Sequence, residues 1–435
     1  MDPLHKLSLR ELAVGVRARR WTAAEVMRAC AARIEAWEPR VQAWAHLDVE
    51  RAIAGAKALD ATAAHGTLGG VPVAVKDIID VAGMPTRYGS DIYASAPPAP
   101  ETAECVEALM RAGAIVVGKT VSTEFAYYSP GKTRNPWNTA HTPGGSSMGS
   151  AAAVACGMIA GALGTQTNGS VIRPAAFCGV VGFKPSLGTV SNHGTMDPWP
   201  TLDQTGVFAR DVADAASLAA VVTRHGTVST KIMMPGHTPR LALVRSPVWH
   251  LADPAQQAML ESNAALLSHA GAHVVELDLP PLFDQAHRAH GVIMAFEAAR
   301  YFREVQQRNR AQISARMNEL LDEGANVAES QYRQALEITQ ALRDEFARIV
   351  ADHDAVITPP ATGEAPATLK ETGSPTFCTI WTLLGVPAIT IPVGFGPAGL
   401  PLGLQIVGRE LEDDQALTIA AWCESHLPFP GLPGQ

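Results

Sequence analysis

Apolar residues near the N-terminus recur at the spacing of amphipathic helices. They occur every three or four residues in LRELAVGV, which begins at Leu9, and in VMRACAARIEAW, which begins at Val26. Thr22 is followed three residues later by Glu25, the pattern of a capping box at the start of a helix. Residues 1–64 are therefore predicted to form an N-terminal helical layer.

From Gly70 onward, short β-rich runs alternate with helical segments. VPVAVK and AIVVGK have the composition of strands, and TAECVEALMRAGA between them has helical spacing. Long amphipathic helices are predicted over 282–354, and strands return in DAVITPP and VPAITIPVG. This alternation predicts a layered α/β fold, and no repeat, low-complexity tract or linker divides the chain.

Composition is that of an ordinary globular protein. The 435 residues are 47% hydrophobic and 17% charged, and the formal net charge of −8 gives no reason to expect nucleic acid or an anionic membrane as a partner. The six cysteines are scattered without metal-binding spacing, so we expect buried thiols in a reducing compartment and no metal site. The N-terminus lacks the apolar segment of a secretory signal, and a cytoplasmic location is expected.

Candidate chemistry concentrates in a segment rich in glycine, serine and small apolar residues, from Thr142 to Lys184. Ser146 lies in a glycine-rich turn before an alanine-rich helical stretch, and Ser170 lies in a second such turn, 24 residues later. Lys76 ends the apolar run VPVAVK, where a solvated lysine would be out of place. The competing interpretation is that Lys76 ends a strand and either points to solvent or pairs with Asp77 or Asp80.

These residues and their surroundings resemble the amidase signature family, serine hydrolases that use a Ser, cis-Ser and Lys triad. The matching blocks run in family order from about Gly70 to Leu417, nearly the whole chain. They are GVPVAVKD, GAIVVGKTVSTEFA, TRNPW, GGSS, GS-x-x-x-P-A, GVVGFKPS, TLDQTG with ARDVADAA, and GVPAITIPVGFGPAGLPLGLQIVGRELEDDQAL. The resemblance implies one large α/β domain over 1–435, with a central mixed, twisted β-sheet covered by helices on both faces and a signature core over 65–215.

By resemblance, Ser170 is the nucleophile, Ser146 relays its proton through a loop with a cis Gly145–Ser146 peptide bond, and Lys76 is the base and then the acid. Lysine can accept a proton only when neutral, which requires a desolvated setting that lowers its pKa toward roughly 7 to 8. Backbone N–H groups of the turn before the nucleophile are expected to form the oxyanion hole: Thr167, Asn168 and Gly169, with Ser170. This mechanism requires no metal or organic cofactor.

The chain departs from the usual nucleophile loop GTDTGGSIR. Gln166 stands where the family has Asp, Asn168 where it has Gly, and Arg173 lies one place later than the usual arginine. The altered polar pairing is expected to bring Gln166 or another partner to Arg173. Asn168 is expected to take up whatever dihedral angles a glycine would there, and Asn is among the few residues that tolerate positive φ. Met148, where the family often has Gly, adds a bulky side chain near the relay serine.

The substrate pocket is expected to be formed by the 127–128 loop, the helices of 282–354, which would shape the entrance, and the region 377–381. The substrate-binding candidates are Tyr127, Tyr128, Ser147, Met148 and Trp381. The expected activity is hydrolysis of a C–N bond in a small amide, or a related carbamate or urea. A homodimer is one option, because dimers are frequent among relatives.

Two other functions remain open. One is the glutamine-hydrolysing subunit of a tRNA-dependent amidotransferase, although such subunits usually carry the GTDTGGS loop and a longer C-terminal part. The other is a binding protein that keeps the fold without activity, which retention of the Ser, Ser and Lys set argues against. Residues 113–120, GAIVVGKT, match the phosphate-loop pattern, but AIVV reads as the strand itself and a poor helix start follows, so nucleotide binding is not expected.

Overall fold

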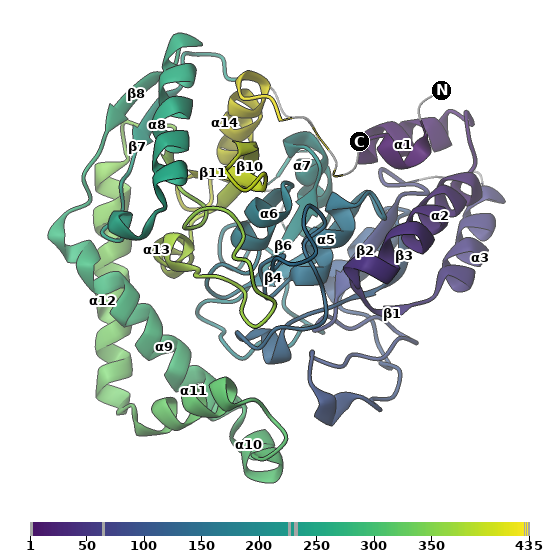
Figure 1. Cartoon of the computed structure of the whole chain (residues 1–435), viewed down its shortest axis with the longest axis horizontal. Coiled ribbons are helices and arrows are strands. Elements are labelled where there is room, and N and C mark those ends of the chain that lie inside the picture. The colour runs from purple at the N-terminus through teal and green to yellow at the C-terminus, as the bar shows by residue number, and fades with distance from the viewer. Residues whose placement is uncertain are drawn as a thin grey trace.

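A single mixed β-sheet organises the molecule (Figure 1). The computed structural model describes residues 3–62, 66–224, 228–229, 234–429, 431 and 433. Within them, the 11 strands follow the order β1-β3-β2-β4-β6-β5-β10-β11-β9-β7-β8. Pairs β3–β2, β2–β4, β9–β7 and β7–β8 are parallel, and the remaining neighbours are antiparallel. The predicted mixed sheet in one domain is confirmed.

The strands are short, and those in the middle of the sheet are buried on both faces. This burial explains why β2, PVAVK, and β4, GALGTQ, lack the alternation of apolar and polar residues that a strand with one solvent-exposed face would show. The bounds are β1 Trp44–Leu47, β2 Pro72–Lys76, β3 Ile115–Thr120, β4 Gly161–Gln166, β5 Val181–Lys184, β6 Gln204–Ala209, β7 Arg240–Leu243, β8 His273–Glu276, β9 Ala355–Thr358, β10 Ala388–Phe395 and β11 Pro401–Val407.

The N-terminal segment is mostly helical, as predicted, but it also supplies an edge strand. Helices α1 (Leu9–Arg17), α2 (Ala23–Val41) and α3 (Val49–Asp60) form the purple layer of Figure 1, and the capping box of Thr22 and Glu25 is present. Between α2 and α3, β1 pairs with β3. The predicted helical layer therefore also contains a four-residue strand, Trp44–Leu47. The predicted boundary at 64/65 lies outside the described residues.

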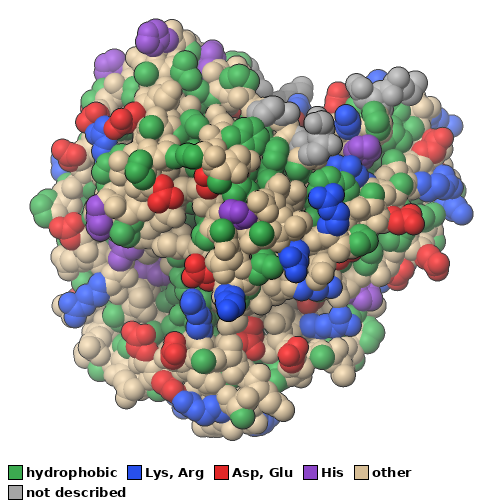
Figure 2. All heavy atoms as spheres, in the orientation of Figure 1, with side chains coloured by type: hydrophobic (Ala, Val, Ile, Leu, Met, Phe, Trp, Pro, Cys, Tyr) green, Lys and Arg blue, Asp and Glu red, His purple; other side chains and the backbone are tan. Residues whose placement is uncertain are grey.

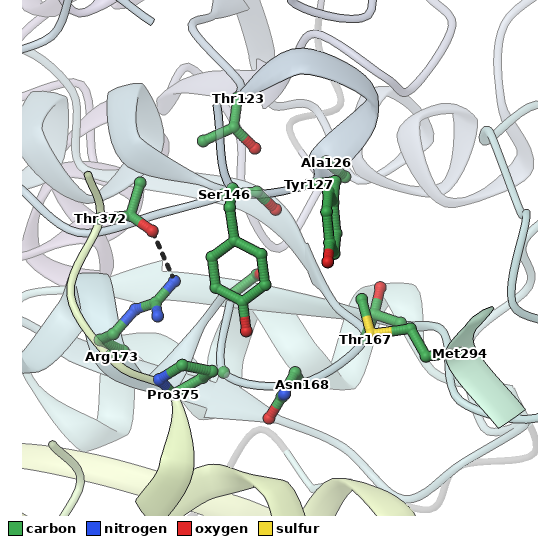
Figure 3. Close-up of a pocket in the computed structure, with 13 residues that line it drawn as sticks. Thr123, Ala126, Tyr127, Ser146, Thr167, Asn168, Arg173, Met294, Thr372 and Pro375 are labelled. Carbon is green, nitrogen blue, oxygen red and sulfur yellow. Dashed lines mark hydrogen bonds between the residues drawn. The ribbon is translucent and has the colours of Figure 1, made fainter. Parts of the chain in front are cut away.

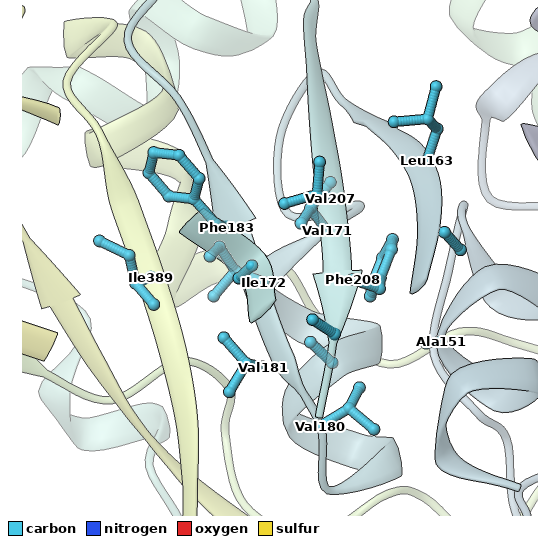
Figure 4. Packing of buried hydrophobic residues seen from close by; sticks show 14 of the residues in the cluster. Ala151, Leu163, Val171, Ile172, Val180, Val181, Phe183, Val207, Phe208 and Ile389 are labelled. Atoms are coloured by element: carbon cyan, nitrogen blue, oxygen red, sulfur yellow. The ribbon is translucent and has the colours of Figure 1, made fainter. Parts of the chain in front are cut away.

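Helices pack against both faces of the central strands. Helices α5 (Met148–Ala155) and α6 (Ile172–Cys178) contact each other and the middle of the sheet, and every residue of both is buried. Helices α7 (Val212–Val222) and α14 (Asp413–His426) form a second contacting pair on these strands, and α4 (Glu104–Arg111) packs on α7. Figure 4 shows the apolar core between strands and α6, with Phe183, Val207 and Ile389 side by side. Truncating such a buried phenylalanine typically costs about 3 to 5 kcal/mol.

The second half of the chain adds a group of helices over 286–349, here called the helical wing and shown in green in Figure 1. Helix α8 (Pro254–His269) packs on β8, and α9 (Ala286–Tyr301) contacts α11, α12 and α13. The other helices of this half are α10 Arg303–Asn309, α11 Ala315–Asn326, α12 Glu329–Ile349 and α13 Thr376–Leu384. Short 3-10 turns lie at Leu4–Lys6, Asp91–Tyr93, Glu124–Ala126, Trp249–Leu251 and Pro281–Gln285. The predicted helical segment 282–354 is thus present.

The surface carries mixed charge. On the face that Figure 2 shows, Lys and Arg side chains are interspersed with Asp and Glu. Within the described ranges, none of the helices combines the length and the hydrophobicity that crossing a bilayer requires. All six cysteines are buried free thiols.

Candidate active site

Two cavities lie at the junction of the sheet core and the helical wing. The inner cavity has about 300 Å³ of space between atoms, part of it open to solvent, and both predicted serines line it. Figure 3 labels Ser146 among its lining residues. Its lining residues are Thr123, Ala126, Tyr127, Tyr128, Ser146, Thr167, Asn168, Gly169, Ser170, Arg173, Met294, Thr372 and Pro375. The outer cavity, of about 710 Å³, shares Tyr127, Tyr128, Asn168, Met294 and Pro375 with it and is otherwise lined by His287, His290, Gly291, Leu320, Glu323, Ser374, Thr376 and Thr379.

Lys76 lies at the end of β2, behind Ser146, which lines the inner cavity. Its side chain is fully buried, and its Nζ lies 2.7 Å from Ser146 Oγ and 2.7 Å from Thr165 Oγ1. Thr165 belongs to β4, which runs parallel to β2 with Val75 opposite Leu163. The register of these two strands thus carries Thr165 beside Lys76, a partner that the sequence motifs did not reveal.

Burial lowers the pKa of Lys76 from 10.5 to about 7, while the charge of Asp203 opposes this shift. A lysine with this pKa is substantially neutral near pH 7 and can accept a proton there. The competing interpretation, an ion pair with Asp77 or Asp80, is wrong. Asp77 instead pairs with another buried lysine, Lys119, at 3.2 Å. Lys119 lies near the end of β3, which covers Ile115–Thr120, so most of the GAIVVGKT segment is a strand, as expected.

Ser146 and Ser147 are neighbours in sequence but face different surroundings. The Gly145–Ser146 peptide bond is cis, as the resemblance implied, and Gly144 has a φ of +83°. Ser146 lines the inner cavity, whereas Ser147 Oγ accepts a hydrogen bond from Thr165 N–H at 3.2 Å. The hydroxyl of Ser147 therefore ties the start of α5 to β4.

Gln166, one of the residues that depart from the family pattern, holds the turn before Ser170. Gln166 Oε1 accepts hydrogen bonds from the N–H groups of Val171 and Ile172 at 2.8 and 3.0 Å, and its Nε2 donates to Thr382 at 2.9 Å. Gln166 is thus occupied by the first turn of α6 and by Thr382, and the expectation that it serves Arg173 is wrong. Asn168 is not among the residues with positive φ, so the backbone here does not need the tolerance for positive φ that Asn offers.

The peptide groups of this turn are arranged as donors. Within the described residues, the backbone N–H groups of Asn168, Gly169 and Ser170 have no hydrogen-bond acceptor, and all three residues line the inner cavity. Ser170 is 7% exposed, and in the described part of the chain no hydrogen bond joins its hydroxyl to that of Ser146. The geometry thus provides free donors and two hydroxyls around one small space.

Two buried side chains from distant segments hold Thr167, and sequence reasoning missed both. Thr167 Oγ1 donates a hydrogen bond to Asp203 Oδ1, and burial raises the pKa of this carboxyl. His290, from α9, lies with Nε2 2.9 Å from the carbonyl oxygen of Thr167. Burial lowers the pKa of His290 to about 4, so it is neutral and donates this hydrogen bond at ordinary pH. His290 carries no motif, and its role follows only from the packing of α9.

Arg173 brings a positive charge to the inner cavity from α6. Its guanidinium donates to the carbonyl of Gly145 at 2.7 Å, to Thr372 Oγ1 at 3.2 Å and to the carbonyl of Gly373. Figure 3 shows it beside Thr372, across the cavity from Met294. The partners of Arg173 are therefore neutral groups of two loops, not Gln166.

Three of the five substrate-binding candidates lie away from both cavities. Tyr127 and Tyr128 line both, but Ser147, Met148 and Trp381 line neither. Met148 is 1% exposed, and its Sδ accepts a hydrogen bond from Gly131 N–H at 3.2 Å; Trp381 is buried against Phe346 at a ring distance of 5.6 Å. The prediction is corrected for these three, because helix packing turns their side chains into the core.

Comparison with known proteins identifies the family of the chain. The sequence profile of the amidase family matches residues 25–417. The chain belongs to the amidase family. Enzymes of this family act on C–N bonds.

Members with different names are similar to the chain over nearly its whole length. It is 32% identical to a subunit of the glutamyl-tRNA(Gln) amidotransferase of Chloroflexus aggregans, over 96% of both proteins. A crystal structure of an amidase superposes with a TM-score of 0.89 at 31% identity, covering 97% of this chain and 100% of that one. The peptide amidase of Stenotrophomonas maltophilia gives a TM-score of 0.85 at 28% identity, covering 100% of both chains.

Proposed function

We propose that this amidase-family protein is an amidohydrolase that cleaves a C–N bond of a small amide, or of a related carbamate or urea, through an acyl-enzyme on Ser170. The observation that carries the proposal is the fully buried Lys76, whose pKa lies at about 7 and whose Nζ lies 2.7 Å from Ser146 Oγ at the cavity that Ser170 also lines. A base of this pKa and position suits proton removal from serine.

The proposed reaction begins as neutral Lys76 takes the proton of Ser146, which in turn takes the proton of Ser170. Ser170 Oγ bonds to the substrate carbonyl carbon, and the oxyanion that develops is stabilised by the free N–H groups of the turn before Ser170. The protonated lysine returns a proton through Ser146 to the leaving nitrogen, and the C–N bond breaks. Water then attacks the acyl-enzyme by the same relay and releases the acid.

The missing hydrogen bond between the two serine hydroxyls is compatible with this sequence of steps. Catalytic hydrogen bonds are often long in the absence of substrate and tighten in the complex. Asp203 and His290, which bind Thr167, are proposed as positioning residues that hold the turn with its N–H groups toward the cavity. No step requires a metal or an organic cofactor.

A second candidate is the glutamine-hydrolysing subunit of a tRNA-dependent amidotransferase. The name of the Chloroflexus aggregans relative favours it. We expected such subunits to have a longer C-terminal part than this chain. The chain spans 96% of that relative, so length does not separate the two functions, and that expectation is wrong. The loop sequence GTQTNGS still differs from the usual GTDTGGS. In this loop Gln166 accepts hydrogen bonds from the N–H groups of Val171 and Ile172 at the start of α6. A cytoplasmic location and a homodimer remain predictions.

The test is release of ammonia or amine from a panel of amides, anilides, carbamates, ureas and glutamine. Ser170→Ala should lose all turnover of whichever member the unsubstituted protein hydrolyses. Ser147→Ala is the matched control, because its hydroxyl faces Thr165 and not the cavity. Turnover that survives Ser170→Ala would refute the assignment of the nucleophile. Glutamine hydrolysis that appears only with a co-purifying partner protein would favour the second candidate.

A further inference from the structure

Thr123 lines the inner cavity with a hydroxyl group that has no hydrogen bond. The residue is 1% exposed, and its buried Oγ1 has no partner within the described part of the chain. No other hydroxyl among the described lining residues is both buried and unpartnered. Oγ1 of Thr167 donates to Asp203, and Oγ1 of Thr372 accepts from Arg173. Burying a hydroxyl without a partner is unfavourable, and a polar group that enters the cavity would remove this cost.

Thr123 does not use its hydroxyl to cap a helix. It precedes the 3-10 turn Glu124–Ala126, where a threonine often caps, but its side chain makes no capping hydrogen bond. Its N–H donates to the carbonyl of Ser146 at 3.2 Å, and its carbonyl accepts from the N–H of Ala126 at 3.1 Å. Its methyl group lies beside Gly145, where an added Cβ would come within 3.1 Å of Thr123 Cγ2. The backbone and the methyl group therefore fix the residue, and the hydroxyl is left for a ligand.

The hydroxyl of Thr123 lies where the proposed reaction delivers a proton to the leaving nitrogen. Figure 3 shows Thr123 next to Ser146, with its hydroxyl directed toward the cavity, and Asn168 on the opposite side. Ser146 is the proposed donor of that proton, and the free N–H groups of residues 168–170 are the proposed oxyanion donors. A substrate whose carbonyl oxygen binds these N–H groups can place its nitrogen between Ser146 and Thr123.

The outer cavity does not extend to this side of the inner cavity. Neither Thr123 nor Ser146 lines the outer cavity, whereas Asn168 lines both cavities. The larger space is therefore available to the acyl part of a substrate, and the leaving nitrogen has little room for a substituent. An unsubstituted amide nitrogen, which leaves as ammonia, suits this division of space.

We propose that Thr123 determines specificity at the leaving nitrogen: its Oγ1 accepts a hydrogen bond from an N–H group of that nitrogen, and the preferred substrates are primary amides. The inference rests on the proposed function and names its substrate class. A threonine hydroxyl has two acceptor sites, and the nitrogen of a primary amide carries two N–H groups. Ser170 Oγ bonds to the carbonyl carbon, the C–N bond breaks, and the nitrogen takes the proton from Ser146 and leaves as ammonia.

The first experiment compares ligands of the same shape with and without the N–H group. Titration calorimetry on Ser170→Ala measures binding of benzamide, butanamide and phenylacetamide, and of acetophenone, methyl propyl ketone and phenylacetone, in which a methyl group replaces the amide nitrogen. A further Thr123→Val change should lower the amide-to-ketone affinity ratio about fivefold, the contribution of one neutral hydrogen bond. Thr123→Ser keeps the hydroxyl and should retain most of the ratio. An unchanged ratio in Thr123→Val, or no binding by any of the three amides, would overturn the proposal.

Ser122→Ala is the matched control for the first experiment. Ser122 is the neighbouring residue, is 1% exposed and also has a buried hydroxyl without a partner in the described residues, but it lines neither cavity. This change should leave the amide-to-ketone ratio as it is. An equal fall of the ratio in Ser122→Ala and Thr123→Val would mean that any change in this segment lowers the ratio, and the assignment to Thr123 would be refuted.

The second experiment uses the unsubstituted protein and covers the case in which Thr123→Val does not fold. A primary amide should be hydrolysed with a kcat/KM at least about tenfold above that of the N-methyl and N-phenyl amides of the same acid, because each added group must be forced into the space beside Thr123. Equal values for the three amides would overturn the preference.

Failure of this inference and failure of the proposed function give different results. An amide-to-ketone preference that depends on Thr123, without turnover by the unsubstituted protein, would leave the contact and refute the proposed function. Turnover of amides with an affinity ratio that does not depend on Thr123 would leave the proposed function and refute the inference.

Discussion

Replacing Lys76 with methionine should stabilise the folded protein at pH 7 and abolish turnover. The folded protein holds the pKa of Lys76 at about 7, against 10.5 for an exposed lysine. The unfolded chain therefore binds more protons between these values, and folding must release one. This release costs about 4 kcal/mol at pH 7 and about 1 kcal/mol at pH 10, at about 1.36 kcal/mol per unit of pKa. The penalty is full below pH 7 and disappears as the pH rises through 10.5.

Methionine removes this penalty but also removes two hydrogen bonds. Its unbranched side chain suits a buried site. Loss of the contacts from Lys76 to Ser146 and Thr165 costs about 1 kcal/mol each. Lys76→Met should therefore be more stable than the unsubstituted protein by about 2 kcal/mol at pH 7 and less stable by about 1 kcal/mol at pH 10. The change of sign with pH is the specific expectation.

Urea unfolding of both proteins at pH 7, 8, 9 and 10, followed by circular dichroism, measures this difference. Burial also lowers the pKa of Lys184 to about 7, but Lys184 is present in both proteins, so its contribution cancels. Lys119→Met is the matched control: it leaves the buried Asp77 without its partner and should destabilise at pH 7. A stability difference that stays constant from pH 7 to 10 would mean that Lys76 is protonated in the fold, and the proposed base would be refuted.

Two further substitutions test how the site is held. Gly144→Ala should destabilise the protein by more than about 2 kcal/mol in urea unfolding, because φ is +83° and a Cβ would lie 2.7 Å from Pro174 Cα. Gly188→Ala, with φ +80° and open space, should cost about 1 to 2 kcal/mol; an equal loss at both positions would contradict the predicted clash. His290→Phe frees the Thr167 carbonyl and should lower kcat about tenfold, the cost of one hydrogen bond, whereas His290→Gln should retain more activity. A kcat unchanged in His290→Phe would remove its positioning role.

Local sequence pattern predicted the parts of the site that lie on continuous segments. The apolar run before Lys76 predicted a buried strand, and the strand is buried throughout. The small residues around Ser146 and Ser170 predicted tight turns beside a helical stretch, as found. The edge strand β1 was missed, because it has four residues, only one of them fully buried, directly after a long helix.

The remaining contacts depend on tertiary packing that no local pattern contains. Thr165 meets Lys76 through strand register, Asp203 lies 36 residues from Thr167, and His290 lies 123 residues from it. Adjacency in sequence was equally misleading. Ser147 and Met148 follow Ser146 directly, yet the first turn of α5 directs both into the core. Closeness in sequence therefore predicted the proposed catalytic residues better than it predicted the residues that line the cavity.

The division of the two cavities between halves of the chain has an evolutionary consequence. The residues proposed for chemistry come from positions 76 to 173, whereas much of the outer cavity comes from 287 to 323 and 374 to 379. Apart from His290, which holds Thr167, residues of the later segments can change and reshape what enters without disturbing the proton relay. Descendants of one ancestor can therefore acquire new substrates by drift in α9, α11 and α13 alone, and recombination between relatives in this region is a direct route to altered selectivity.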